Sequence, residues 1–150
     1  MAITTALCNS FKGEILQGIH DLTNDTLKVA LIRSNTIMSG TYDADTENYS
    51  NVTGNGDEAS GTGYTSTGEQ LSSILIAVDD TENVANVDFA NVTWASSSIT
   101  AAGCIIYNET QSGKAIAVID FGGDKTSTNG DFVIEFPDPA TPTDAIIVIS

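Results

Sequence analysis

The stretch Thr26-Leu-Lys-Val-Ala-Leu31 decides the fold class, because the side chains begin to alternate there with a period of two residues. Leu27, Val29 and Leu31 fall on one face of an extended chain, and the residues between them fall on the other. This alternation is typical of a β-strand with one face toward the core. We therefore expect strands from residue 26 onward.

Further runs of this kind follow, and turn-forming residues separate them. The expected strands lie near residues 71–78, 86–94, 99–107, 115–121, 132–136 and 145–149. The separators include the Gly-rich segment 122–130 and the segment 137–143, which holds the prolines of the chain. About seven or eight short strands at this spacing predict a mainly β fold, an antiparallel, jelly-roll-like β-sandwich over residues 26–149.

Upstream of residue 26 the apolar residues repeat with a helical period instead. At 100° per residue they form a stripe about 120° wide. The stripe consists of Leu7, Cys8, Phe11, Ile15, Ile19 and Leu22. We therefore expect one amphipathic helix over residues 3–22, with Thr4 or Thr5 placed to cap its start. Two interpretations stay open: the helix covers the protein's own sheet, or it inserts into a partner subunit.

Length and composition predict a single domain over residues 1–150. Hydrophobic residues make up 41% of the chain and charged residues only 17%, a mixture typical of a compact β protein. Residues 39–68 differ, because they contain no sustained apolar run and carry several acidic residues. A segment of this length without its own structure is usually either functional or disordered. We expect residues 39–68 to form a long exposed acidic loop that faces outward or toward a partner.

The charge balance excludes several classes of partner. Twenty acidic residues face five basic ones, so the net charge is −15. No Lys or Arg occurs between Arg33 and Lys114, whereas 11 acidic residues do. Nucleic-acid binding needs cations that displace counterions from phosphates, and anionic membranes repel acidic proteins. No apolar run reaches the roughly 18 residues that cross a bilayer. We expect neither a nucleic acid nor a membrane as partner.

The cysteines and the amino-terminal segment indicate where the chain is made. Residues 1–20 lack the basic start and uninterrupted apolar centre of a signal peptide. Cys8 and Cys104 are far apart in sequence and do not have a metal-type spacing. We expect two buried thiols made in a reducing cytoplasm, and a single disulfide is the alternative.

No residue pattern indicates catalysis, so we expect a protein that is not an enzyme and has no cofactor. His20 is the only histidine, and the helical period places it on the polar face, solvated and away from any nucleophile. A zinc site from His20, Cys8 and Cys104 would lack the usual ligand spacings. A two-carboxylate glycosidase is the enzyme alternative, but such sites lie in clefts lined by aromatics. Trp94 is expected in the core or in an interface.

Residues 43–47, Asp-Ala-Asp-Thr-Glu, begin like a calcium loop. The template requires Gly at its sixth position and Glu at its twelfth, where this chain has Asn48 and Gly54. The segment therefore does not fit an EF-hand, and weak binding of divalent cations by clustered acids stays as an alternative.

Several separated segments resemble, in order, a family of small virion proteins of tailed bacteriophages. These are MAITTALCNSFKGEILQGIH (1–20), LKVAL (27–31), GTGYT (61–65), FANVTW (89–94), IIYN (105–108), AIAVIDF (115–121) and GDFVIEF (130–136). Members are described as phage structural, decoration or fibre-like proteins. The resemblance runs nearly end to end and implies a place on the virion, without assigning the part. It carries no catalytic residues.

Within that resemblance the leading hypothesis is a capsid decoration or cement protein. It would be made in the bacterial cytoplasm, bind the major capsid protein on the outer capsid surface and stabilise the shell. A homotrimer would suit threefold capsid positions. The amino-terminal third is the expected attachment face, because Phe11 lies there together with the cations Lys12, Lys28 and Arg33.

The alternative is a tail, fibre or head-spike protein that recognises host surface glycans. It would use the 39–68 loop, with Tyr42, Tyr49 and Tyr64 as exposed aromatics that meet sugar rings.

Overall fold

The computed structural model describes residues 2–137 and 145–150. Within these residues 47% lie in strands and 10% in helices, and the longer strands pair in antiparallel sheets with a sandwich-like arrangement. The predicted mainly β, antiparallel sandwich is therefore confirmed. The expected strand at 145–149 begins within the described residues, whereas the expected turn at 137–143 lies mostly outside them.

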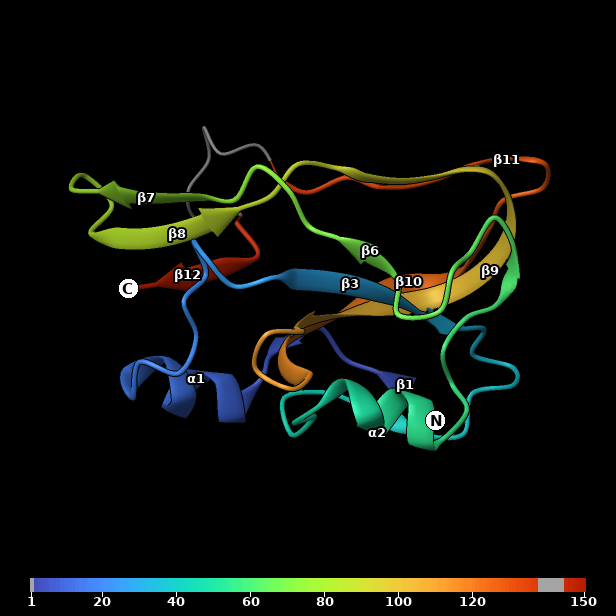
Figure 1. Cartoon of the computed structure of the whole chain (residues 1–150), viewed down its shortest axis with the longest axis horizontal. Helices are drawn as coiled ribbons and strands as arrows, with labels where there is room; N and C mark the ends of the chain where they lie inside the picture. The colour runs from blue at the N-terminus through green and yellow to red at the C-terminus, as the bar shows by residue number, and fades with distance from the viewer. Residues whose placement is uncertain (1, 138–144) are drawn as a thin grey trace.

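The elements follow one another in this order, and Figure 1 shows their arrangement. They are β1 (Ala2–Ile3), β2 (Ala6–Leu7), α1 (Asn9–Leu16), β3 (Leu27–Arg33), β4 (Thr41–Tyr42), α2 (Tyr49–Gly54), β5 (Gly61–Thr62), β6 (Glu69–Gln70), β7 (Leu75–Asp79), β8 (Val84–Asp88), β9 (Val92–Asn108), β10 (Lys114–Thr126), β11 (Gly130–Ile134) and β12 (Ile147–Ile149).

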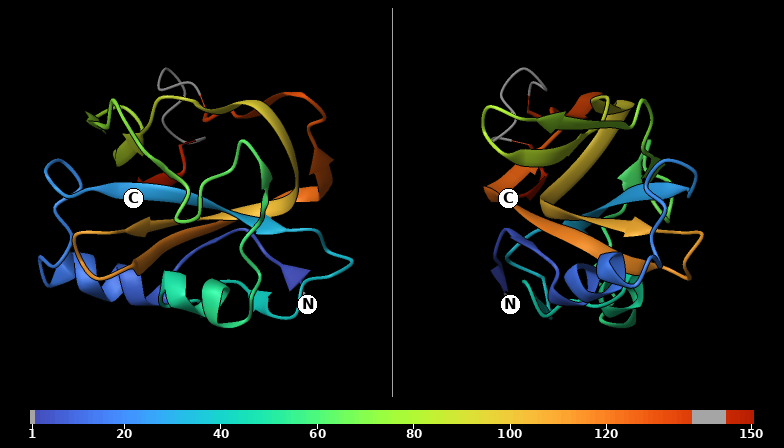
Figure 2. Two further views of the ribbon diagram at one scale, coloured as in Figure 1. Left: turned by 45° about the vertical axis from the view of Figure 1, so that its right-hand side comes forward. Right: turned by 90° about the vertical axis from the view of Figure 1, so that its left-hand side faces the viewer.

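The largest sheet runs in the order β2-β10-β9-β3-β6, and β11 and β5 also pair with β9. A three-stranded sheet has the order β12-β8-β7, and β1 pairs with β4 in parallel. Both helices lie on one side of the β3, β9 and β10 layer, and the β7–β8 hairpin and β11 lie on the other side (Figures 1 and 2). The core includes side chains of the helices, of the β3, β9 and β10 layer, and of the strands on its other side.

Strand β9 links the layers because it bends. Its first part pairs with β11, whereas its second part, from Ala101 to Asn108, lies between β3 and β10. Ser96 near the bend has a positive φ of 49°, and the pairing with β11 shifts register there. A bend of this kind lets one strand pass from one layer of a sandwich to the other. The alternation predicted two strands, 86–94 and 99–107. The first of these ranges is divided between β8 and the start of β9, and β9 continues without a break through the second.

The predicted helix over residues 3–22 is wrong in its length, since α1 covers only Asn9–Leu16. Before it, β1 and β2 are extended and pair with β4 and β10. After it, Gly18 adopts a φ of 71°, and the Gly18 and Ile19 amides donate to the carbonyls of Ile15 and Glu14. This is the hydrogen-bond pattern of a Schellman motif, which ends a helix. Gly18 is therefore a helix stop rather than a point of close approach.

The prediction that residues 39–68 form an exposed loop is also wrong in part. The segment contains β4, α2 and β5, and it buries Tyr42, Val52 and Ala59 in the main core. Asp57 is fully buried as well. Asp57 and Glu58, which were expected in solvent, instead form hydrogen bonds and an ion pair that bind this segment to the rest of the fold. Polar side chains thus add to the stability of the segment, and an apolar pattern does not reveal their contribution.

Candidate interface

The three cations of the amino-terminal third do not form one attachment face. Lys28 and Arg33 lie at opposite ends of β3. The Lys28 Nζ is 2.9 Å from the Glu109 carboxylate, and the Arg33 Nη2 is 3.0 Å from the Asp57 carboxylate. Lys12 is exposed on α1 and donates to the Asn9 side chain. Two of the three charges are therefore compensated within the protein.

Two of the aromatic residues proposed to contact a partner are buried. Phe11 is only 1% exposed, and its ring centroid lies 5.0 Å from that of His20. Tyr42 is also 1% exposed, and its hydroxyl donates to the Asp57 carboxylate at 2.6 Å. Both rings belong to the protein's own core, so neither is an exposed aromatic face on which a sugar could stack.

Tyr49 and Tyr64 are partly buried and bound by Glu58. Both hydroxyls donate to the Glu58 carboxylate, at 2.7 Å and 2.8 Å. The Ser66 hydroxyl and the Thr67 amide donate to it too. Burial, and after it the neighbouring Glu58, raises the pKa of Tyr49 to about 12. Glu58 thus gathers a loop onto the sheet, and the tyrosines serve this contact rather than a surface for glycans.

His20 is buried, which corrects the expectation of a solvated residue on the polar face of a helix. The helix ends before it, and the turn at Gly18 directs the imidazole inward. Its Nε2 is 2.6 Å from the Glu14 carboxylate, and its Nδ1 is 3.0 Å from the Asn108 Nδ2. Because that amide nitrogen is a donor, Nδ1 accepts, and the neutral Nε2–H tautomer fits the site. The contacts join α1 to the end of β9.

Reactive side chains do not gather elsewhere in the described part of the chain. Cys8 and Cys104 are buried and free, which confirms the expected thiols. Burial raises the pKa of each to about 12, so both are protonated near neutral pH. Within residues 2–137 and 145–150 no three His, Cys, Asp or Glu side chains are placed to hold a metal ion. Trp94 is 2% exposed, as expected of a core residue.

Exposed apolar side chains, by contrast, are concentrated at one end of the molecule. Among the described residues, most of the large hydrophobic side chains that are exposed lie on α1 or on the β12-β8-β7 sheet. They are Leu16 (89% exposed), Val78 (74%), Ile149 (53%), Leu75 (49%) and Ile76 (48%). An exposed cluster of this kind usually marks an interaction site, whereas single exposed apolar residues do not.

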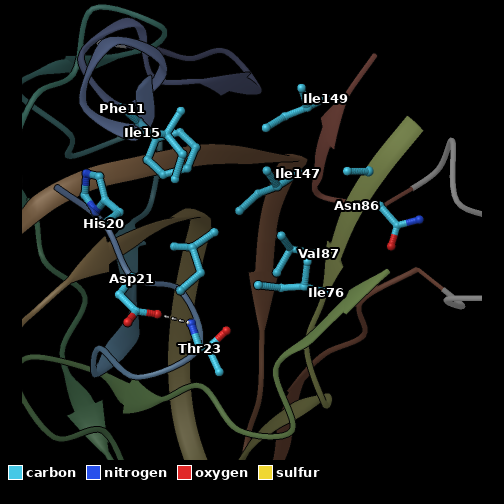
Figure 3. A pocket seen from close by; sticks show the side chains of 12 residues that line it. Phe11, Ile15, His20, Asp21, Thr23, Ile76, Asn86, Val87, Ile147 and Ile149 are labelled. Atoms are coloured by element: carbon cyan, nitrogen blue, oxygen red, sulfur yellow. Dashed lines mark hydrogen bonds between the residues drawn. The ribbon is translucent and has the colours of Figure 1, made fainter. Parts of the chain in front are cut away.

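An apolar groove lies at this end, between α1 and the three-stranded sheet. It is a hollow of about 330 Å³ that adjoins a second one of about 240 Å³. The apolar side chains in its lining include Phe11, Ile15, Ile76, Val87, Ile147 and Ile149. Ile76, Val87 and Ile147 are paired across the three strands, so their side chains share one face. Figure 3 shows that face turned toward Phe11 and Ile15.

One signal for this groove is present in the sequence, in the strand predicted at residues 71–78. The predicted strand 71–78 reads Leu-Ser-Ser-Ile-Leu-Ile-Ala-Val, and its second half is apolar on both faces. A strand with both faces apolar is expected inside a sheet, yet β7 has only β8 as a neighbour among the described strands. An apolar strand at a sheet edge is therefore a candidate surface for contact with another molecule.

In the described part of the chain, no helix has the length and apolar character needed to span a bilayer. Comparisons of the chain with models of known protein families, with curated proteins and with solved structures find no match. The apolar groove is therefore the structural feature that bears on function.

Proposed function

We propose that the chain is a structural protein of a tailed-phage particle, a decoration or cement protein that binds the major capsid protein on the outer capsid surface and stabilises the shell. One structural observation supports an assembly role: Ile76 and Ile149 are exposed where they line the apolar groove, and the exposed Val78 lies on the same face of the sheet. The phage setting comes from the resemblance of the sequence segments.

The charge distribution supports an outer position on the particle. A net charge of −15 keeps neighbouring proteins and particles apart and disfavours contact with the packaged nucleic acid. The attachment contact must then be apolar or must meet basic residues of the partner. The apolar groove supplies an apolar contact, whereas the ion-paired Lys28 and Arg33 supply little free positive charge.

The glycan-binding alternative has less support from the side chains. Its aromatic residues Tyr42, Tyr49 and Tyr64 donate their hydroxyls to Asp57 or Glu58 and pack against the core. A sugar platform needs an aromatic face that is open to solvent. A polar hollow near Arg33, with Ser60, Ser98 and Thr100 in its lining, offers several hydroxyl groups to a sugar.

The number of copies per particle tests the proposal. We expect quantitative mass spectrometry of purified virions to find hundreds of copies, on the scale of the major capsid protein. Particles that lack the chain should release their nucleic acid at a lower temperature than complete particles. A handful of copies would support the tail or fibre alternative instead. If the chain were absent from purified particles, the virion proposal would be wrong.

A further inference from the structure

The apolar groove has two walls of different origin. Phe11 and Ile15 of α1 form one wall, and the sheet forms the other. Across the sheet the side chains repeat in rungs, since Ile76 pairs with Val87 and Val87 with Ile147. The next rung toward the β7–β8 turn joins Val78, Ala85 and Ile149. Asn86 lies between the rungs on β8 and points to the other face of the sheet (Figure 3).

The second rung is the more exposed part of this wall. Val78 is 74% exposed and Ile149 is 53% exposed, whereas Val87 and Ile147 of the first rung are buried. Leu16, at the end of α1, is 89% exposed and lines the adjoining hollow. The groove therefore opens from a buried floor onto an exposed apolar margin. Such a shape lets an inserted apolar side chain lose contact with water on several sides.

Acidic residues surround this apolar margin. Asp21 lines the groove, Asp79 is the last residue of β7, and Asp80 and Glu82 lie in the turn that follows β7. Figure 1 shows this turn at the same end of the molecule as α1. None of the four carboxylates makes an ion pair with another residue in the described ranges. Lys12, which lines the adjoining hollow, is the cation on that side.

A second copy of the chain is a poor occupant for this groove. Two copies that met through it would bring the same uncompensated carboxylates together, and each copy carries a net charge of −15. Like charges placed opposite one another oppose association. An apolar segment with Lys or Arg at its flanks has the complementary chemistry, because it fills the floor and meets the acidic margin at once.

We propose that the apolar groove binds an apolar segment of a different protein that carries Lys or Arg on either side of its apolar residues. The inference rests on the proposed function, an assembly role, and deepens it by naming the face and the chemistry of the partner. Ile76, Val78 and Ile149 contact the apolar residues of that segment. Asp21, Asp80 and Glu82 meet its cations and select it against acidic or neutral segments.

Three peptides of one length test the chemistry of the occupant. The first places Leu on one face of an amphipathic helix and Lys on both sides of that face, the second replaces Lys by Glu, and the third replaces Leu by Ser. We expect the full chain to bind the Leu/Lys peptide, measured by fluorescence anisotropy. The isoleucine methyl resonances of Ile15, Ile76 and Ile149 should shift on binding, whereas that of the distant exposed Ile37 should not.

A matched pair of variants separates the groove from general charge attraction. Ile76→Lys changes the groove, and Ile37→Lys makes the same charge change at an isoleucine of similar exposure, 59% against 48%. Since one buried apolar side chain is worth about a factor of ten or more in affinity, Ile76→Lys should weaken Leu/Lys peptide binding about tenfold. Ile37→Lys should change it by less than about twofold.

Other outcomes would overturn the inference. Equal weakening by the two variants, or equal binding of the Ser/Lys peptide, would mean that charge alone holds the peptide. Preferred binding of the Leu/Glu peptide would assign the groove to a different chemistry. Self-association in sedimentation that Ile76→Lys abolishes would make a second copy the occupant. None of these measurements needs the particle, so they are independent of the count of copies that tests the proposed function.

Discussion

The Arg33 guanidinium and the buried Asp57 carboxylate are 3.0 Å apart, and this ion pair joins the end of β3 to the turn after α2. Asp57 also accepts from the backbone amides of Ser39 and Gly40 and from the Tyr42 hydroxyl. One fully buried carboxylate thus satisfies four donors from separate parts of the chain. Its hydrogen bonds and ion pair hold this segment against β3 in addition to the apolar contacts of Tyr42, Val52 and Ala59.

Asp57→Asn should destabilise the protein strongly. The amide carries no charge for Arg33, and its nitrogen turns a donor toward the Ser39 and Gly40 amides or toward the Tyr42 hydroxyl. Loss of a buried charged acceptor costs about 2 to 4 kcal/mol. The free energy of unfolding in urea measures this loss. The control is Asp80→Asn, at an exposed position, which should change stability by less than about 0.5 kcal/mol. Equal stability of the two variants would contradict the role given to Asp57.

Acid should remove the stabilisation that Asp57 provides. Burial raises the pKa of its carboxyl. Hydrogen bonds from Tyr42, Ser39 and Gly40 and the charge of Arg33 lower the pKa by more than burial raises it, so the pKa lies below the ordinary 3.8. The unfolded chain therefore binds this proton more readily than the folded protein. The stabilisation is complete above the unfolded pKa and is lost as the pH falls through the folded pKa.

Thermal unfolding between about pH 6 and about pH 2 measures this effect. The difference in midpoint between the natural chain and Asp57→Asn should be constant near neutral pH and should shrink below the unfolded pKa. A difference that stayed constant at the lowest pH would mean that Asp57 does not titrate as described.

His20→Phe tests the buried contacts between α1 and β9. Phenylalanine retains a ring against Phe11 but removes both ring nitrogens, so Glu14 loses a donor and Asn108 loses an acceptor. We expect a loss of about 1 to 3 kcal/mol in the free energy of unfolding. In a cycle with Glu14→Ala, the double variant should lose less than the sum of the single losses. Strictly additive losses would mean that the His20–Glu14 contact contributes nothing.

The β architecture was predictable because the strands carry their signal in consecutive residues. The alternation of Leu27, Val29 and Leu31 corresponds to β3, and the apolar runs downstream correspond to β7 to β12. The bend within β9 was not predictable, because the residues around Ser96 are small and polar and read as a break between two strands. Their pairing with β11 and β5 depends on residues far away in the sequence.

The predictions of a helix over residues 3–22 and of an exposed loop over residues 39–68 were wrong for a related reason. Leu7 and Leu22 match a helical stripe in sequence, yet one is in a strand and the other lies beyond the turn at Gly18. Asp57 and Glu58 look like solvated loop charges until their partners are known. Periodicity reports which residues are buried together locally, and it does not report which polar groups find each other across the fold. The candidate groove was not predictable for the same reason, since α1 and β12 are far apart in sequence and lie together only in the folded chain.

The two thiols should react only when the protein unfolds. Burial raises the pKa of Cys8 and Cys104 to about 12, and the attacking species in alkylation is the thiolate. We expect a maleimide to label neither cysteine in the native protein and both in urea, counted by mass spectrometry. Single variants Cys8→Ala and Cys104→Ala identify which thiol is labelled. Absence of labelling in urea without a reductant would indicate a disulfide instead of two thiols.

Gly68 should tolerate no side chain, whereas Gly13 should gain from one. Gly68 has a φ of 77°, and a Cβ there would lie 1.9 Å from the Val29 carbonyl oxygen. Gly68→Ala must therefore distort the turn against β3, and we expect a loss of at least about 2 kcal/mol. Gly13 lies within α1, and a Cβ there would meet no atom within 4 Å. Gly13→Ala should stabilise the protein by about 0.5 to 1 kcal/mol, because alanine favours the helix. Urea unfolding of both variants measures the contrast, and a neutral Gly68→Ala would mean that β3 and this turn are not in contact as described.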